Sequence, residues 1–318
     1  MAKIERAAKV QVTAPEIPLK EPVPTAEKSR LAGKLAAREW VYTVEIVPPQ
    51  GYLLAQTVEK SRLCAAAGFD AVNIPDGPRA SSRVSPLVTA CKIQEGAGIE
   101  TILHFCCRDK NLIGMQADLL GCAAMDINNI LFITGDPPKL GDYPFASGVF
   151  DMDSIGMVRV QSRLNRGVDL AGKPIDAPTK AFIAVGADPN AIDMEREIRR
   201  SREKIEAGAE AFITQPVFDV EPLLRFIDAI PELRDGTVPL IAGIWPLASY
   251  RNAEFMRNEV PGVVVPDSVM ERMAAPATKE EQRQVGIAIA REAIRGKVAG
   301  AQISAPFGNV NTAIAVME

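Results

Sequence analysis

From residue 39 onward, short β-branched or apolar runs alternate with longer segments whose apolar residues recur every three or four positions. Apolar runs bounded by turn residues predict buried strands, and the longer period predicts amphipathic helices. Eight strands are predicted, over Val41–Val47, Asp70–Ile74, Glu100–Cys106, Asn129–Thr134, Lys180–Val185, Glu210–Gln215, Pro239–Ile244 and Gly300–Ala305. Helices are predicted between strands, among them Gln56–Ala67, Lys110–Ala124, Asp193–Ala207, Val220–Ala229 and Lys279–Arg295.

This alternation implies parallel strands joined by crossover helices, and eight such units predict an α/β fold. A doubly wound sheet would show the same alternation, but the Gly-x-Gly-x-x-Gly signature that follows its first strand in dinucleotide-binding proteins is absent. We therefore expect a single (β/α)8 TIM barrel over residues 39–318, preceded by an extended N-terminal arm.

The arm, residues 1–38, is rich in Lys, Glu, Ala and Pro. Pro15, Pro18, Pro22 and Pro24 lie so close together that neither a helix nor an interior strand can form across them. We expect an extended or disordered segment, which serves either as a linker or as a strap along a neighbouring surface.

The composition indicates a folded protein that binds a small molecule. Hydrophobic residues make up 47% and charged residues 24% of 318 positions, and 36 basic against 40 acidic residues leave a net charge of −4. The basic surface of a dedicated nucleic-acid binder is therefore missing. No apolar run approaches the roughly 18 residues of a membrane-spanning helix, and the N-terminus lacks a signal-peptide core. We expect a cytoplasmic protein without a nucleic-acid or membrane partner.

Cysteine and histidine usage argues against a metal site. The five cysteines are odd in number and lie mostly in apolar stretches, which favours reduced, buried thiols. A single histidine, and no Cys-x-x-Cys pair, argue against structural zinc. The adjacent Cys106 and Cys107 end a predicted strand and could reach a ligand, but packing is the favoured interpretation.

Glu45 is the strongest candidate for chemistry. The period of two along the first strand places Tyr42, Val44 and Ile46 on one face and Glu45 on the other, so the apolar face suits the helices and Glu45 faces the barrel interior. A carboxyl group among apolar neighbours at the mouth has a raised pKa, as a general acid requires. The alternative is a buried structural ion pair.

Other polar candidates lie in or just after the carboxyl-terminal parts of predicted strands, where TIM barrels build their sites, and Lys204 lies on the helix before the sixth strand. Each has an alternative structural role: a satisfied core histidine, an Asp-Pro turn, or a solvated lysine. Gln215 offers both donors and an acceptor beside a proline, which suits the edge of a planar heterocycle. The remaining candidates are Asn73, His104, the Thr134-Gly135-Asp136 loop and Lys204.

Six segments together resemble the methylenetetrahydrofolate reductase family, in family order across roughly residues 40–310. They are VEIVPP at Glu45, ILHFCC at His104, LFITGDPP at Asp136, AGAEAFITQPVFD at Gln215, GIWPL at Trp245 and SAPFG near the C-terminus.

The resemblance implies an enzyme of one-carbon metabolism and methionine biosynthesis that reduces 5,10-methylenetetrahydrofolate to 5-methyltetrahydrofolate by hydride transfer through bound FAD. It assigns Glu45 as general acid and Asp136 as the negative charge that stabilises a developing cation. Family positions for flavin contact are Asn73, His104, Thr134, Gly135, Asp136, Phe145, Ala146, Ser147, Ala187 and Lys204. Family positions for folate contact are Glu45, Asp136, Gln215, Asn252 and Met256.

The chain departs from the family pattern where Asn73-Ile74 replaces Thr-Tyr, Asn252 replaces Gln, and Met256 replaces an aromatic residue. These changes leave open a flavin-independent, nicotinamide-dependent folate reductase. They also leave open a folate- or flavin-binding subunit whose arm docks a methyltransferase or an electron-donating partner. The resemblance further implies a homo-oligomer and an electron donor that is NADH, NADPH or a protein.

Overall fold

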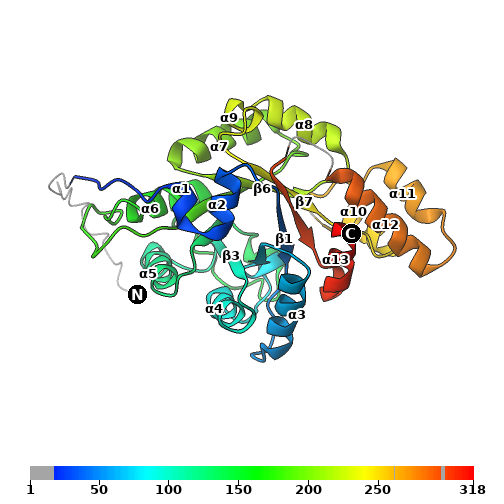
Figure 1. Ribbon diagram of the computed structural model, residues 1–318, viewed down its shortest axis with the longest axis horizontal. Coiled ribbons are helices and arrows are strands. Elements are labelled where there is room, and N and C mark those ends of the chain that lie inside the picture. Colours follow the sequence, from blue (N-terminus) through cyan, green and yellow to red (C-terminus); the bar gives the residue numbers. More distant parts are fainter. Residues whose placement is uncertain (1–17, 261, 295–297) are drawn as a thin grey trace.

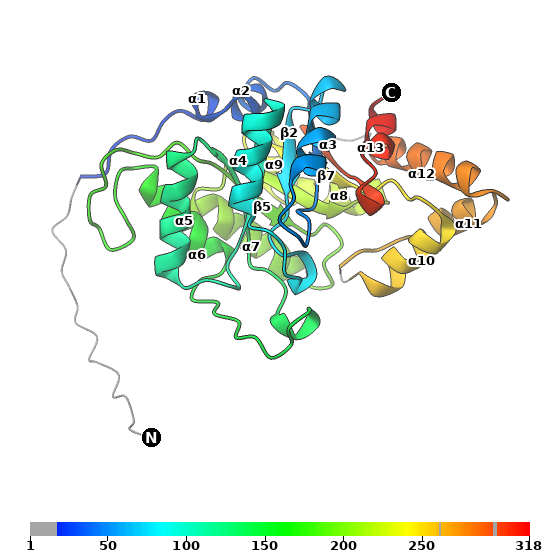
Figure 2. The same ribbon diagram turned by 90° about the horizontal axis from the view of Figure 1, so that it is seen from below.

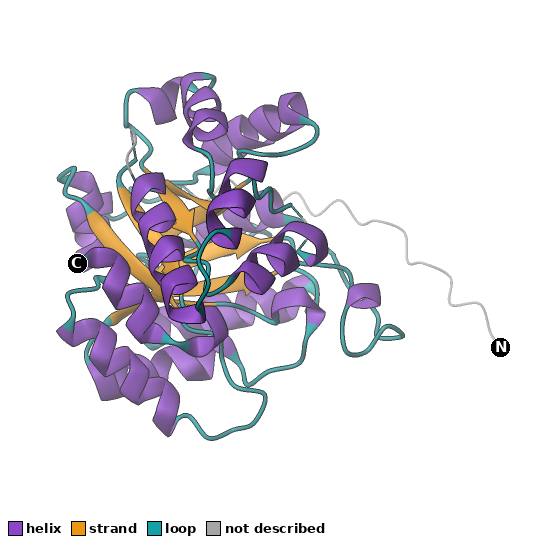
Figure 3. Cartoon of the chain, turned by 90° about the vertical axis from the view of Figure 1, so that its right-hand side faces the viewer, coloured by secondary structure: helices purple, strands orange, loops and turns teal. Residues whose placement is uncertain are grey.

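The computed structural model describes residues 18–260, 262–294 and 298–318 of the chain. Within this part, parallel strands pair in sequence order and close into a barrel, because β1 also pairs with β8. Figure 3 shows the strands enclosed by helices. The predicted (β/α)8 TIM barrel is confirmed. Its strands are β1 Val41–Glu45, β2 Ala71–Ile74, β3 Glu100–Cys106, β4 Asn129–Ile133, β5 Phe182–Ala187, β6 Ala211–Pro216, β7 Leu240–Ile244 and β8 Gly300–Ser304.

Helices form the outer layer around the strands, as Figure 1 shows. Three single turns of 3-10 helix lie in loops: η1 Pro78–Ala80, η2 Pro138–Leu140 and η3 Pro306–Gly308. The last predicted residue of the helix Lys279–Arg295 lies outside the described residues. The helices that follow the first strand are α3 Ala55–Ala66, α4 Pro86–Ala97, α5 Leu112–Ala124, α6 Ser154–Leu164, α7 Met194–Ala207, α8 Val220–Asp228, α9 Pro231–Arg234, α10 Tyr250–Glu259, α11 Asp267–Ala274, α12 Lys279–Ala293 and α13 Val310–Met317.

The barrel interior changes from apolar to polar toward the carboxyl ends of the strands. Val41 packs among apolar side chains from six other strands, while Thr43 and Glu45 follow it on the same inward face. The intervening Val44 packs outward against the helix layer, as the period of two predicts. The fold therefore separates an apolar floor from a polar mouth.

The expectation of an extended arm is wrong for residues 25–36, which form helices α1 Thr25–Lys28 and α2 Arg30–Ala36. Leu31, 1% exposed, packs into the apolar floor, and Figure 2 shows both helices along one edge of the barrel. Pro24 immediately precedes α1, and the Ser29 hydroxyl caps α2 by accepting from the Ala32 N–H at 2.9 Å. Helices thus begin after the prolines rather than across them. Residues 1–17, including Pro15, lie outside the described residues.

A third apolar cluster, called the outer cluster here, lies outside the barrel in the segment from the loop after β7 to α12. Met256 on α10 and Met273 on α11 are buried in it, together with Leu247 from the loop after β7. Among the described residues, no helix is long and apolar enough to cross a membrane.

Candidate active site at the barrel mouth

Glu45, the last residue of β1, lies at the mouth in register with Asn73 on β2 and Ser304 on β8. The residue as a whole keeps some exposed surface, but its carboxyl group is buried, and this burial raises the pKa of the group to about 7. Burial is the cause of this rise, and none of the salt bridges found among the described residues involves Glu45. The group therefore exchanges a proton near neutral pH, as a general acid must.

A hydrogen-bonded chain crosses the interior beside Glu45. Asn73 is fully buried; its Nδ2 donates to Thr43 Oγ1 at 2.8 Å, and its Oδ1 lies 3.2 Å from His104 Nε2. Burial lowers the pKa of His104 to about 3, so the imidazole is neutral. Since the Asn73 oxygen can only accept, the contact places the His104 proton on Nε2 and leaves Nδ1 as an acceptor. Asn73 thus orients His104, and both ends of its amide are engaged within the protein.

The loop after β4 requires a glycine at its first turn. Gly135 has φ +89°, and a Cβ at this position would lie 2.1 Å from Cys106 Sγ. Asp136 follows with its side chain exposed at the rim. Thr134 Oγ1 accepts from the Ser154 N–H at 3.3 Å, which ties the end of β4 to the start of α6.

Arg108 holds the loops of three strands together, and no sequence signal distinguishes it from a surface arginine. It is 3% exposed, and its guanidinium donates to the Gly77 carbonyl at 3.3 Å and to the Asp136 carbonyl at 3.2 Å. It also forms two hydrogen bonds of 2.7 Å with Asp109. Arg108 therefore sets the backbone position of Asp136.

Asp76, after β2, is a second site residue absent from the sequence prediction. Its carboxylate accepts from the Cys106 N–H at 3.1 Å, and burial raises its pKa. The Cys106 thiol is itself buried, which raises its pKa to about 11. Packing, the favoured interpretation of this cysteine, agrees with that burial.

Lys204 reaches the carboxyl end of β5 from helix α7. Its Nζ donates to the Gly186 carbonyl at 2.7 Å, and burial lowers its pKa. The inward side of Gly186 is open, since a Cβ there would meet nothing within 4 Å. The methyl group of Ala187, in contrast, points outward and packs in the apolar layer between the strands and the helices. Only the backbone of Ala187 therefore lies near the mouth.

A pocket of about 530 Å³ adjoins this end of β5. It is lined by Arg196 and Arg200 of α7, by the segment around Asp188, and by residues 262–264. Arg200 also forms a salt bridge of 2.8 Å with Asp153. The pocket thus holds two arginines together with the carboxyl groups of Asp188, Asp193 and Glu197.

The other predicted positions are not gathered around Glu45. Phe145, Ala146 and Ser147 lie exposed in the loop after η2, with Phe145 87% exposed and its ring 6.2 Å from that of Tyr143. Met256 is 1% exposed within the outer cluster, so it does not face the mouth.

The two predicted folate-contacting amides, Gln215 and Asn252, differ in exposure and in hydrogen bonding. Gln215 is exposed near the end of β6, within a register shift between Ile213 and Pro216. Asn252 is buried, and its Oδ1 accepts from Trp245 Nε1 at 3.4 Å and from the Ala248 N–H at 3.2 Å. Gln215 is therefore available to a ligand, whereas the Asn252 oxygen holds the loop after β7.

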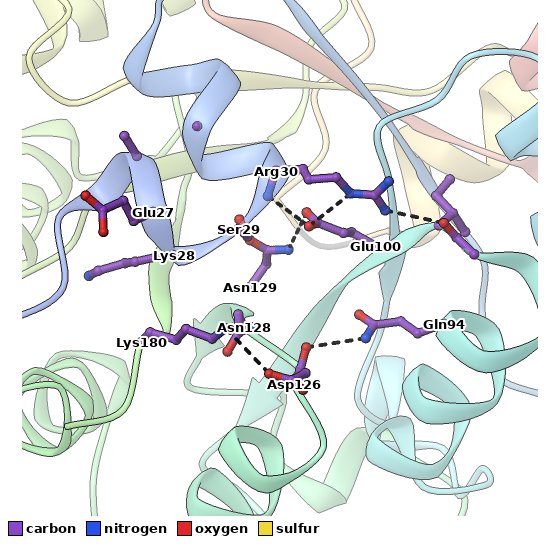
Figure 4. A pocket seen from close by; sticks show the side chains of 14 residues that line it. Glu27, Lys28, Ser29, Arg30, Gln94, Glu100, Asp126, Asn128, Asn129 and Lys180 are labelled. Carbon is purple, nitrogen blue, oxygen red and sulfur yellow. Dashed lines mark hydrogen bonds and ion pairs between the residues drawn. The ribbon is translucent and has the colours of Figure 1, made fainter. Parts of the chain in front are cut away.

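A cavity of about 650 Å³ lies at the opposite end of the barrel, between α1–α2 and the amino ends of β3 and β4 (Figure 4). Two pairs of its charged side chains form salt bridges, Arg30–Glu100 at 3.4 Å and Lys180–Asp126 at 3.5 Å, and Lys28 pairs with Glu210. These pairs join the N-terminal helices and loops to the barrel, and the polar mouth remains the candidate site.

Across the described residues, no group of three or more His, Cys, Asp or Glu side chains is arranged to hold a metal ion.

Comparison with known proteins identifies a family and a shared fold. The sequence model of the methylenetetrahydrofolate reductase family matches residues 30–305. A probable methylenetetrahydrofolate reductase (NADH) of Oryza sativa is 25% identical over 232 residues, which cover 70% of this chain and 39% of the relative. The Schizosaccharomyces pombe methylenetetrahydrofolate reductase 1 is 22% identical over 90% of this chain and 47% of its own length. The chain thus spans less than half the length of these relatives.

A Clostridium thermocellum protein described as binding two copies of 5-methyl-5,6,7,8-tetrahydrofolic acid has a similar structure. Its TM-score is 0.62 at 18% identity, covering 90% of this chain and 97% of that one, which shows a shared fold. The family model matches most of this chain, and the chain folds into a closed barrel. These findings lead to one conclusion: the chain belongs to the methylenetetrahydrofolate reductase family.

Proposed function

We propose that the chain is a flavin-dependent reductase that transfers hydride to 5,10-methylenetetrahydrofolate and yields 5-methyltetrahydrofolate. The observation that carries the proposal is Glu45, a carboxyl group at the mouth whose pKa burial raises to about 7. The sequence relatives support it, since those of rice, fission yeast and Buchnera aphidicola are all named methylenetetrahydrofolate reductases.

The residues at the mouth fit FAD. The open inward side of Gly186 provides space, and the buried Lys204 supplies a cation at the adjoining carbonyl. Arg196 and Arg200 in the neighbouring pocket are the groups that would contact a diphosphate, since guanidinium groups bind phosphate oxygens; Asp188, Asp193 and Glu197 line the same pocket. A flavin bound here would supply a two-electron carrier that accepts hydride from the reductant and passes it to the folate.

The protein side chains then supply proton transfer, charge and orientation. In its neutral form Glu45 donates its proton to the folate nitrogen that leaves when the methylene bridge opens, so that an O–H bond breaks and an N–H bond forms. The Asp136 carboxylate at the rim favours the positive charge that develops on the substrate. Gln215, exposed at the end of β6, offers an amide to the edge of the folate heterocycle.

A nicotinamide dinucleotide is the proposed reductant, because relatives in rice and maize are named as NADH enzymes and one in Caenorhabditis elegans as an NADPH enzyme. Self-association and a partner subunit remain predictions from the resemblance.

Separate measurement of the two half-reactions tests the proposal. We expect the purified protein, supplied with FAD, to show flavin absorption that NADH or NADPH bleaches under anaerobic conditions. Methylenetetrahydrofolate should restore the absorption. Glu45→Gln should slow this second step by about 10² to 10⁴-fold and leave the first nearly unchanged, because only the second requires the general acid.

Glu254→Gln, on the exposed side of α10, is the matched control, and we expect it to leave both steps unchanged. Equal slowing of both half-reactions in Glu45→Gln would contradict the role of Glu45. Folate reduction by a nicotinamide in flavin-free protein would instead favour direct hydride transfer. Binding of folate without turnover by any donor would favour a binding subunit.

A further inference from the structure

Gln302, in the middle of β8, is a buried amide with an unused donor. The residue is 7% exposed, and its Nε2 has no hydrogen-bond partner in the described part of the chain. Its register partners are Thr43 on β1 and Gly243 on β7. Since Val41, two residues before Thr43, packs in the apolar floor, Gln302 faces the barrel interior with it.

A buried donor without an acceptor destabilises a fold, so a nearby acceptor is expected to use it in some state of the protein. Gly243 has no side chain to offer. Thr43 Oγ1 accepts from Asn73 and retains a second lone pair, but Gln302 Nε2 does not hydrogen-bond to it in the structure. The next inward-facing group on β1 is Glu45, two residues beyond Thr43.

The spacing permits contact between the two side chains. In-register strands lie about 4.8 Å apart and rise about 3.3 Å per residue, so the Cα atoms of Gln302 and Glu45 are roughly 8 Å apart on the diagonal. Two long side chains on the same face bridge this distance. The register therefore places Gln302 within side-chain reach of Glu45, although the two groups form no hydrogen bond in the structure itself.

The other groups around Glu45 offer no competing cation. On β2 and its loop lie Asn73, engaged with Thr43 and His104, and Asp76, an acid. His104 on β3 is neutral, and Asp136 after β4 is a second acid. Ser304 on β8 is the register partner of Glu45, and its hydroxyl group is a second possible donor to the Glu45 carboxylate.

We propose that Gln302 is a positioning residue for Glu45: its Nε2–H donates to the carboxylate that remains once Glu45 has given up its proton. The amide holds the carboxylate toward the mouth and stabilises its charge, which the surrounding strands do not neutralise. The consequence for turnover rests on the proposed function, whereas the hydrogen bond itself does not.

The protonation of Glu45 can be measured without substrate. Infrared difference spectra between wild type and Glu45→Gln isolate the C=O band of the neutral Glu45 carboxyl group, and its loss between pH 5 and pH 9 gives the pKa. Gln302→Met keeps the length of the side chain and removes the donor. We expect this variant to raise the pKa of Glu45 by about one pH unit.

Two further variants keep the proposal falsifiable. Gln302→Asn retains the amide on a shorter stem and should give a pKa of Glu45 between those of wild type and Gln302→Met; it also serves if the methionine variant does not fold. Ser304→Ala removes the competing hydroxyl and should leave the pKa nearly unchanged. Equal pKa values in wild type and the Gln302 variants, or a rise only in Ser304→Ala, would overturn the proposal.

Turnover provides the second readout. We expect Gln302→Met to lower kcat for folate reduction about tenfold, with KM little changed and the pH profile moved in the same direction as the infrared titration. A moved infrared titration in a protein that does not reduce folate would support the hydrogen bond and refute the proposed function. Folate reduction that depends on Glu45, together with an unchanged infrared titration in Gln302→Met, would support the proposed function and refute the hydrogen bond from Gln302.

Discussion

Replacing Glu45 with Gln should make the folded protein more stable at alkaline pH than the wild type. Burial raises the pKa of Glu45 from 4.5 to about 7. Between these values the folded chain keeps a proton that the unfolded chain has lost, so the free energy of unfolding falls as pH rises. Above pH 7 both states are ionised, and the buried charge costs the wild type about 3 kcal/mol that a neutral amide does not.

Urea denaturation followed by tryptophan fluorescence measures this difference at pH 5 and pH 8.5. The stability of Glu45→Gln relative to the wild type should increase by about 2.5 kcal/mol over this range, because other titrating groups are common to both proteins. A hydrogen bond from Gln302 to the carboxylate would reduce the increase, so this figure is an upper value. Glu254→Gln removes an exposed carboxylate and should show a much smaller change. An equal stability difference at both pH values would refute a raised pKa of Glu45.

Three further predictions concern the frame around the site. Gly135→Ala should lower the free energy of unfolding by about 2–4 kcal/mol in urea denaturation, because the new methyl group would lie 2.1 Å from Cys106 Sγ and φ is +89°; Gly186→Ala, whose methyl group meets nothing within 4 Å, should not. Leu31→Ala should lower the free energy of unfolding by about 2–5 kcal/mol, because Leu31 of α2 packs in the barrel core. Leu19→Ala, at a side chain 45% exposed, should lower it little. A small effect of Leu31→Ala would contradict the packing of α2 against the barrel. Native Cys106 should react slowly with iodoacetamide at pH 8, since burial raises its pKa to about 11, and fast labelling detected by mass spectrometry would contradict its burial.

Local periodicity carried enough information to predict the barrel. The predicted bounds of β3 agree with the observed strand, and the other predicted strands differ from the observed ones by at most two residues at either end. The same period of two placed Glu45 on the inward face of β1, where the structure has it. These predictions succeed because side-chain direction along one strand depends only on that strand.

The arm shows where local reasoning stops. The prolines exclude a helix only across their own positions, and Leu31 is buried because the apolar floor of a distant barrel is available to it. Met256 is similarly buried because α10 and α11 pack together outside the barrel. Neither partner surface is visible from the sequence around these residues.

The sequence by itself determined the strand order, the inward direction of Glu45 and the glycine that the turn after β4 requires. Tertiary structure decided how those groups are supported: Asn73 is engaged by Thr43 and His104, and Gln302 is left with a free donor. The physical reason is that each of these contacts joins separate strands. Hydrogen-bond partners, and the lack of one, follow from the register in which distant strands pair, which no local pattern specifies.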